Sequence, residues 1–439
     1  MRETTMPQDT PDTAVFSGNE DLNPHYAWDR AIPAPGHSAV DFEKRVDFTR
    51  LHKYRLGRAQ EALANSDLGA ILCFDNNNIR YLTSTVIGEW SRDKVARYAM
   101  LMGGHDPHLW DFGSAAAHHR LHAPWLPTDN CHAGMLGLRG TVPPAAGLMD
   151  SAAKEIKQML VDNGMADMPL GVDICEPPMM LALQAEGIDV RDAQQVMLDA
   201  REIKSIDEIV LLNQAAAMVD GVYHMIGEEL KPGVRENDIV AKANEMLYEM
   251  GSDDVEAINA ISGERCNPHP HNFTDRMIRP GDQAFFDVLH SYSGYRTCYY
   301  RTFNVGRATD AQEDAYKQCR EWIDAAIDLV RPGVSTDEIA AVWPKAEEFG
   351  FSDEMEAFAL QFGHGLGVAI HERPIISRLC SMDDPMEIKT GMVFALETYC
   401  PATDGFSAAR IEEEMVVTPD GPQIISLYPA EELPIANKY

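Results

Sequence analysis

The strongest constraint on the fold is an internal repeat. The segments Leu230–Ile239 and Val330–Ile339 match in register one hundred residues apart, and both contain Pro-Gly-Val. Each copy follows one amphipathic, helix-like stretch and precedes another, and the Pro-Gly pair marks the turn between them. Two copies are too few for a solenoid, which stacks three or more repeats. The repeat therefore predicts a domain of two α/β halves related by a pseudo-twofold axis, with their strands forming a sheet between the helix pairs.

The length of 439 residues predicts a second domain, because chains of this size ordinarily exceed one hydrophobic core. Residues 1–45 are polar and rich in Pro, Asp and Gly, which predicts an arm without a core of its own. Residues 46–198 predict an α/β domain, and residues 199–439, beginning with a helix near Asp199, form the duplicated domain. In the first domain a turn is expected at 75–78, strands at 68–74, 98–102, 108–112 and 170–173, and helices at 46–64, 151–163 and 178–186.

The charge balance limits the classes of partner. The chain has 37 basic and 69 acidic residues and a formal net charge of -32 at pH 7. Such a surface repels nucleic-acid backbones and anionic membranes, so neither is expected as a partner.

No apolar run approaches the roughly 18 residues of a membrane helix, and the N-terminus lacks the apolar region of a secretory signal, which predicts a cytoplasmic protein. The eight cysteines are scattered singly, and most are expected to be small buried hydrophobic residues.

The stretch 285–303, FFDVLHSYSGYRTCYYRTF, predicts a β-hairpin that turns at Ser293 and Gly294. Its first strand carries one carboxylate, Asp287. The facing strand is a suitable place for a second acid, but it offers Cys298 instead. Three interpretations are open at this point: a metal site with an unusual ligand, a site that has lost its metal, or a hairpin without chemistry.

Four further polar clusters fall in the second domain, in or beside strand-like stretches. Taken singly, each has a structural explanation, because a histidine among glycines often caps a turn and a glutamate at a strand end often faces solvent. Taken together, they supply the oxygen and nitrogen ligands that divalent transition metals bind. The clusters are residues 262–276, 363–374, 391–399 and 409–417, and they contain His271, His364, His371, Glu397 and Glu412.

The order of these residues resembles the pita-bread family of aminopeptidase P, prolidase, methionine aminopeptidase and creatinase. The order is Asp287, a second ligand position eleven residues on, His364-Gly-x-Gly, Glu397 and then Arg410-x-Glu412. The Pro-Gly-Val repeat and the segments 201–205 and 78–83 also fit, and the likeness covers the chain after about residue 45. The resemblance implies a creatinase-like N-terminal domain, a pita-bread catalytic domain and a homodimer.

In the metal-dependent members of that family, two Asp, one His and two Glu hold a dinuclear centre. The corresponding positions here are Asp287, Cys298, His364, Glu397 and Glu412. Cys298 stands where those members have the aspartate that bridges both metals, so a dinuclear centre is not expected. The resemblance leaves two states open: one divalent ion, zinc or iron, with a thiolate ligand, or no metal, as in creatinase.

Similarity to creatinase and the peptidases also implies roles for other residues. The creatinase counterpart of His271 moves protons and that of Glu397 holds a cationic substrate, while His371 matches a histidine that contacts the substrate in the peptidases. A histidine with a near-neutral pKa suits acid–base work. We therefore expect His271, His371 and Glu397 to be catalytic. The side chains expected to bind the substrate are Trp90, Tyr295, Arg301 and Arg410.

The expected function is hydrolysis of a C–N bond, amide or amidino, in a small polar molecule that could be cationic. The alternative is β-elimination on a small carboxylate, because a bacterial dimethylsulfoniopropionate lyase shares this fold, a polar arm and a stretch similar to residues 74–81. That lyase holds its metal with three aspartates and has an aspartate base where this chain has His371. A non-catalytic pseudo-peptidase that binds a partner is the third candidate, which the retained histidines and the acidic surface disfavour.

Overall fold

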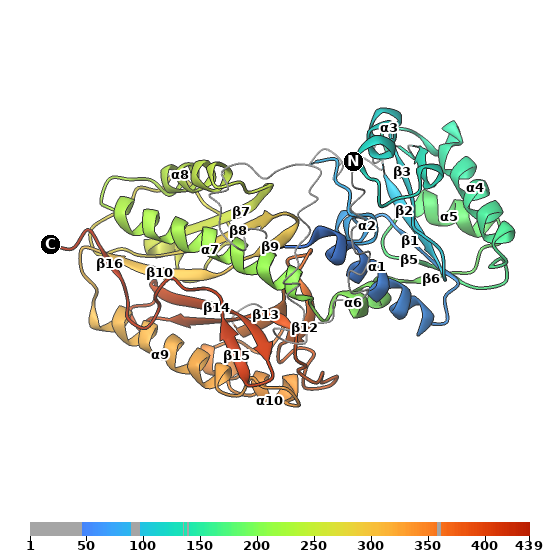
Figure 1. The fold of residues 1–439 in the computed structure, drawn as a ribbon. Helices are drawn as coiled ribbons and strands as arrows, with labels where there is room; N and C mark the ends of the chain where they lie inside the picture. The colour runs from blue at the N-terminus through green and yellow to red at the C-terminus, as the bar shows by residue number, and fades with distance from the viewer. Residues whose placement is uncertain (1–45, 89–96, 135, 138–139, 358–360) are drawn as a thin grey trace, which may run out of the picture. The chain divides into compact units, whose positions relative to one another are not determined.

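The computed structural model describes residues 46–88, 97–134, 136, 137, 140–357 and 361–439 (Figure 1). The chain divides into two compact units. The first runs to Arg201 and includes Ser205–Asp207, and the second consists of Glu202–Lys204 and Glu208–Tyr439. This division lies close to the boundary expected at residue 199. The expected arm at 1–45 and Trp90 lie outside the described residues.

The first unit is a mixed α/β domain built on a six-stranded sheet, with the strand order β4-β3-β2-β1-β5-β6 among the described residues. Strand β1 pairs antiparallel with β2 and parallel with β5. Both β1 and β2 are buried along their whole length, which explains why their sequences are continuous apolar runs. The elements are α1 (Phe48–Ala64), β1 (Ala70–Cys73), α2 (Asn76–Thr83), β2 (Tyr98–Met102), β3 (His108–Asp111), α3 (Gly113–His122), β4 (Cys131–Ala133), α4 (Leu148–Asp162), β5 (Leu170–Val172), α5 (Pro177–Ala185), β6 (Val190–Asp192) and α6 (Gln194–Arg201).

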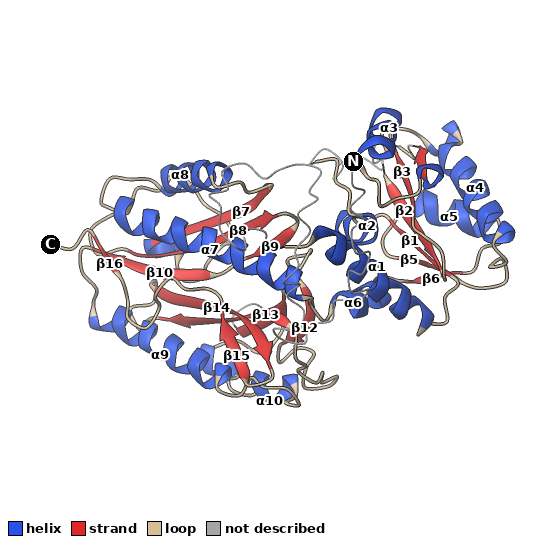
Figure 2. Ribbon diagram, viewed as in Figure 1, coloured by secondary structure: helices blue, strands red, loops and turns tan. Residues whose placement is uncertain are grey.

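The second unit has two five-stranded sheets between helices, as far as the described residues extend (Figure 2). One sheet has the order β16-β10-β8-β7, with β9 also paired to β8, and it packs against α7 and α8. The other has the order β12-β11-β13-β14-β15 and packs against α9 and α10. The elements are α7 (Ile206–Glu229), α8 (Glu236–Glu249), β7 (Asp254–Ser262), β8 (Gln283–Tyr292), β9 (Tyr295–Thr297), β10 (Tyr300–Val305), α9 (Asp310–Ile327), α10 (Thr336–Ala340), β11 (Gln361–Gly365), β12 (Glu372–Ile376), β13 (Val393–Pro401), β14 (Ala408–Thr418), β15 (Gly421–Ile424) and β16 (Ile435–Ala436).

The internal repeat is visible in the backbone hydrogen bonds. In the first copy Gly233 N donates to Ile278 O at 3.0 Å, and in the second copy Gly333 N donates to Ile388 O at 2.9 Å. The two glycines have φ angles of 94° and 91°, a left-handed conformation that favours glycine. The same turn therefore joins the helices in both halves.

The two copies differ in the helix that follows the turn. Helix α8 has 14 residues, whereas α10 has 5. Pro344 lies shortly after α10, and a proline lacks the N–H that a helix interior requires and disfavours the helical conformation of the residue before it. The second helix of the second copy is therefore shorter than the matched sequences suggest.

Two boundaries also differ from the sequence prediction. Residues 76–83 form α2 instead of starting as a turn, because the Asp75 side chain caps the helix by accepting from two backbone amides. The helix expected to start near Asp199 is two helices, α6 and α7, separated by residues 202–205.

In the described part of the chain, α7 is the one helix long and apolar enough to suit a membrane. However, 56% of its most apolar window is buried in the protein, as in a core helix.

The hairpin predicted at 285–303 is present, with one interruption. Strand β8 turns at Ser293 and Gly294, and β9 and β10 both pair with β8 in one continuous register. Between β9 and β10 the strand is broken at Cys298 and Tyr299. The backbone amide of Cys298 donates instead to the Glu414 carboxylate, at 2.8 Å. Cys298 is thus tied to the second sheet as well as to the first.

Candidate metal centre

Strand β14 presents three consecutive glutamates, Glu412–Glu414, to the protein interior. Side chains alternate along a strand, so Glu412 and Glu414 share one face and Glu413 lies on the other. Glu412 lies directly opposite Glu397 of β13. A run of acids ordinarily faces solvent, but each of these three glutamates is 6% exposed or less. The strand therefore delivers buried carboxylates to both of its faces.

Three side chains from separate elements converge on one point. Cys298 Sγ lies 3.6 Å from His364 Nε2 and 3.6 Å from Glu412 Oε1, and these imidazole and carboxylate atoms are 3.6 Å apart. A tetrahedral zinc ion with bonds of about 2.0–2.3 Å separates its ligand atoms by about 3.3–3.8 Å, so the three atoms fit one such ion. Among the described residues they are the one group of three or more metal-binding side chains this close together, and all three are buried. We refer to Cys298, His364 and Glu412 as the triangle.

The other two predicted ligands are held by neighbouring side chains. Asn259 Nδ2 donates to Asp287 Oδ2 at 3.1 Å, and Arg410 Nη2 forms an ion pair with Glu397. We refer to Asp287 and Glu397 as the tethered acids, and neither belongs to the triangle. Asp287 Oδ1 and Glu412 Oε2 are buried without a hydrogen-bond partner. Buried acceptors are normally satisfied, so both oxygens have capacity for a cation or a donor.

Burial controls the protonation of these groups. Desolvation, followed by the charge of Glu397, raises the pKa of Asp287 to about 7. Desolvation raises the pKa of Glu414 to about 8, and it raises the pKa of Glu412 and of the Cys298 thiol well above their usual values. Without a cation the site therefore holds protons near neutral pH, and a metal ion would have to displace those of its ligands, Glu412 and Cys298.

Arg410 is the cation that faces these acids. Its guanidinium lies 4.0 Å from the centre of the Tyr300 ring, and its Nη1 lies 2.6 Å from His269 Nε2. Arginine only donates hydrogen bonds, so this Nε2 accepts and the His269 proton sits on Nδ1. Burial, and then the charge of Arg410, lower the pKa of His269 to about 3, which keeps the ring neutral. Arg410 itself is 2% exposed, which leaves little of its surface for the substrate contact expected from the sequence.

His271 and His371, the histidines expected to be catalytic, lie at the exposed edge of the site. The His371 ring centre is 4.6 Å from that of His364, and the His271 ring centre is 4.5 Å from that of His269. Burial is the main cause that lowers the pKa of both, and the charge of Glu397 opposes it at both. Both imidazoles are therefore within electrostatic range of the same carboxylate.

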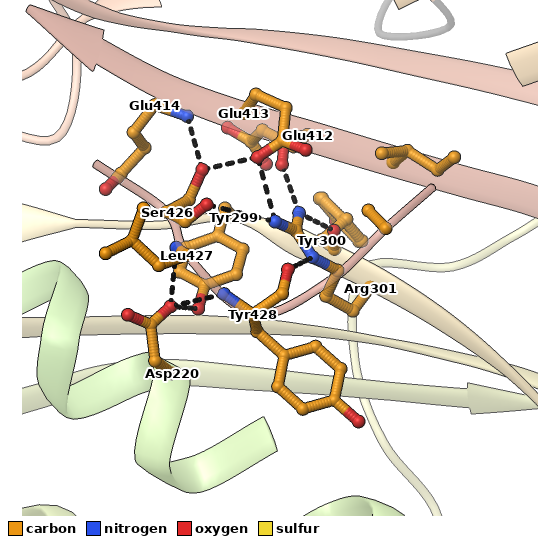
Figure 3. Close-up of polar contacts among 12 residues, drawn as sticks. Asp220, Tyr299, Tyr300, Arg301, Glu412, Glu413, Glu414, Ser426, Leu427 and Tyr428 are labelled. Atoms are coloured by element: carbon orange, nitrogen blue, oxygen red, sulfur yellow. Dashed lines mark hydrogen bonds and ion pairs between the residues drawn. The ribbon is translucent and has the colours of Figure 1, made fainter. Parts of the chain in front are cut away.

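Tyr295 and Arg301, which were also expected to contact a substrate, are enclosed. Tyr295 is 0% exposed, and its hydroxyl donates to a buried glutamate. Arg301 is 1% exposed and lies between the β14 glutamates and residues 426–428 (Figure 3). Its Nη2 donates to Glu413 Oε2 at 2.8 Å, and its Nε donates to Tyr428 O at 2.9 Å. Trp90 lies outside the described residues.

Two residues that contact the site were missed from the sequence. His269 reaches Arg410, and Glu414 accepts from the backbone of Cys298. The available signal for Glu414 was strand alternation, which places it on the same face as Glu412. His269 had no comparable signal, because its loop has no regular period.

Two facing sheets between helices, with this buried ligand group, define the class of the second unit as a pita-bread metallopeptidase fold. Residues 210–419 match the model of metallopeptidase family M24. Solved structures support the fold over most of the chain. The dipeptidase PepE from Mycobacterium ulcerans has a TM-score of 0.71 at 24% identity, covering 89% of this chain and 99% of that one. The Xaa-Pro dipeptidase from Bacillus anthracis has a TM-score of 0.67 at 20% identity, covering 87% of this chain and 99% of that one.

Two curated relatives differ in how much of the chain they match. The probable dipeptidase PepE of Mycobacterium tuberculosis is 31% identical over 244 residues, which is 54% of this chain and 62% of that protein. The chain thus spans less than two thirds of that relative. The dimethylsulfoniopropionate lyase DddP of Roseovarius nubinhibens is 25% identical over 409 residues, which is 87% of each chain.

Proposed function

We propose that this chain is a hydrolase that cleaves the amide bond of a small peptide-like molecule at a site holding one divalent metal ion. The observation that carries the proposal is the triangle, whose three donor atoms are spaced as one ion requires. The match to the M24 model supports it, as do relatives named as a probable dipeptidase and an Xaa-Pro dipeptidase. The homodimer and the cytoplasmic location stay predictions.

Cys298, His364 and Glu412 would hold the ion, and the thiolate and imidazole donors favour zinc, with ferrous iron as the second choice. The charges in the site support a cation, since the single guanidinium of Arg410 interacts with three buried carboxyl groups, those of Asp287, Glu397 and Glu412. When bound, the ion would supply Lewis acidity toward an amide carbonyl and a nearby water. One ion fits better than two, because Asn259 and Arg410 already engage Asp287 and Glu397.

The two histidines at the exposed edge provide acid–base groups. Because the pKa of His271 and of His371 is lowered, both rings are neutral at pH 7 and can accept a proton from a water molecule or a substrate. Glu397 is within electrostatic range of both and would stabilise either ring after it becomes an imidazolium. The proton could then be returned to the leaving amine by the same ring.

A peptide-like substrate suits this geometry better than a cationic one. The creatinase-like expectation assigned a substrate cation to Glu397, but the guanidinium of Arg410 already forms an ion pair with that carboxylate. A cationic ligand would have to displace a buried arginine that also contacts His269 and Tyr300. We therefore propose a neutral or anionic peptide-like amide as the substrate.

Elimination is the second candidate, and it rests on one observation. The match to the lyase covers 87% of each chain, including the first unit, whereas the match to PepE covers 54% of this chain. In this case His371 would remove a proton next to a carboxylate and no water would be consumed.

Labelling of the solvent oxygen distinguishes hydrolysis from elimination. The purified protein is assayed in ¹⁸O-water with a panel of dipeptides and of small β-substituted carboxylates. The proposal predicts one ¹⁸O atom in the carboxylate released from a dipeptide. An alkene product without ¹⁸O, and no dipeptide turnover, would replace hydrolysis with elimination. Turnover of neither class by protein loaded with zinc or iron would contradict both.

A further inference from the structure

We propose that Glu414 is a positioning residue that fixes the backbone of Cys298, so that its sulfur completes the triangle. The inference rests on the single-metal site of the proposed function and assigns a role to a residue outside the metal group. Its basis is a set of contacts between two sheets, all of them buried.

The Glu414 carboxylate accepts hydrogen bonds from Cys298 and from the preceding residue, Thr297. Its Oε1 accepts from the backbone amide of Cys298 at 2.8 Å, and the Thr297 hydroxyl lies 2.8 and 2.7 Å from its two oxygens. Glu414 is 0% exposed and Thr297 is 1% exposed, so water does not compete for these bonds. Thr297 is the last residue of β9, and Cys298 is the first residue of the interruption that follows it.

The direction of the Cys298 side chain depends on the backbone at this interruption. Successive side chains of a strand point to opposite faces, so the backbone conformation at one residue decides which face its side chain takes. The pairing with β8 keeps the same register before and after the break, in β9 and in β10. Only Cys298 and Tyr299 leave the regular strand, and the Glu414 carboxylate holds the first of them.

Strand β14 is itself held in place by further hydrogen bonds at Glu412, Glu413 and Glu414 (Figure 3). Arg301 donates to the backbone carbonyl of Glu412 and to the side chain of Glu413. The backbone amide of Glu414 donates to Ser426 Oγ at 3.0 Å. The strand that carries Glu412 to the metal therefore also sets the position of Cys298, through a carboxylate two residues further along the same face.

The test uses cobalt(II) in place of zinc, because a cobalt–thiolate bond gives a near-ultraviolet charge-transfer band and can be read without any substrate. Metal-free wild type and the Glu414→Ala variant of the full chain are titrated with cobalt. We expect the wild type to show the band. We expect the variant to bind cobalt about 10- to 100-fold more weakly, with the band reduced at least threefold per bound ion.

Glu414→Gln is the matched control, because its amide oxygen can still accept from the Cys298 amide. It should keep the band and bind cobalt within about threefold of wild type. If Glu414→Ala does not fold, as judged by circular dichroism, Glu414→Asp replaces it, since a side chain one methylene shorter cannot maintain the same contacts. A structural role without a positioning effect would lower the melting temperature and leave the band unchanged.

The outcomes distinguish this inference from the proposed function. A wild-type band that is equally strong in Glu414→Ala or Glu414→Asp overturns the role of Glu414 and leaves the metal site standing. Bound cobalt without a thiolate band in the wild type overturns both. A band lost in Glu414→Ala and kept in Glu414→Gln supports both.

Discussion

The triangle and the tethered acids lie in one buried site, but their polar atoms face different partners. Cys298, His364 and Glu412 face one another at 3.6 Å, with no protein cation in the group. Asp287 and Glu397 each have a donor from the protein, an amide and a guanidinium. The comparison divides the site into two halves. One half has three donor atoms spaced for an ion, and the other has acids already engaged by donors of the protein.

The largest effect is expected from removing the guanidinium on the tethered side. Arg410→Gln leaves Glu397 buried without its partner, and breaking a buried ion pair in this way costs about 3–5 kcal/mol. Chemical denaturation of the metal-free protein at pH 7 should show a loss of this size in the free energy of unfolding. The double variant Arg410→Gln/Glu397→Gln should recover most of it. A loss below about 1 kcal/mol in the single variant would show that the pair does not hold this half together.

The next effect concerns the triangle. Cys298→Ala removes one of three donors and should weaken zinc binding by at least about 100-fold, since metal affinity depends on the number and type of ligands. Equilibrium dialysis with elemental analysis measures it. A second variant, Cys298→Asp, should shift the metal preference of the site from zinc toward manganese, because carboxylates suit harder metals. Equal zinc content in wild type and Cys298→Ala would remove the thiolate from the site.

The pH dependence of zinc affinity tests which side chains of the triangle must lose a proton to bind the ion. The pKa values of Glu412 and Cys298 are raised, so both groups are protonated near neutral pH in the metal-free protein and must release protons when an ion binds. Burial lowers the pKa of His364 to about 4, so its ring is already unprotonated and releases none above pH 6. Zinc affinity should therefore rise with pH between about 6 and 8.

Calorimetry in buffers of different ionisation enthalpy counts the released protons directly. The expected number at pH 7 is about two per zinc ion in the wild type and about one in Cys298→Ala. A zinc affinity independent of pH across this range would contradict the assignment of Cys298 and Glu412 as ligands.

The smallest effect is expected at the other tethered acid. Asp287→Asn keeps the shape of the side chain and a hydrogen bond to Asn259, and it removes a group whose pKa is already about 7. Zinc affinity at pH 7 should stay within about threefold of wild type, because outer groups of this kind influence a metal less than its ligands do. A loss comparable to that in Cys298→Ala would place Asp287 among the ligands and restore a centre of the dinuclear type.

Much of the fold could be predicted because it is encoded locally. The Pro-Gly-Val repeat gave the two matching turns, and the apolar run Tyr98–Met102 gave strand β2 at its observed bounds. The helix at 76–83 was missed because asparagine-rich runs are typical of turns, although Asp75 is a good helix cap. The truncation of α10 depends on Pro344, whose effect the matching repeat concealed.

The candidate site was only partly predictable. The residue types and their order pointed to the five ligand positions, because the resemblance fixes them one by one. Their division into a triangle and two tethered acids depends on Asn259 and Arg410, which reach Asp287 and Glu397 across neighbouring strands. Such partners are set by strand register and by the packing of two sheets, which no local pattern in the sequence contains.

Thiolate ligation of a single ion is tested most directly by the zinc X-ray absorption spectrum of the full chain loaded with one equivalent of zinc. Ligation by Cys298, His364 and Glu412 predicts one sulfur neighbour at about 2.3 Å together with nitrogen and oxygen neighbours at about 2.0–2.2 Å. The sulfur signal should vanish in Cys298→Ala. A wild-type spectrum with nitrogen and oxygen neighbours alone would show that Cys298 does not bind the ion.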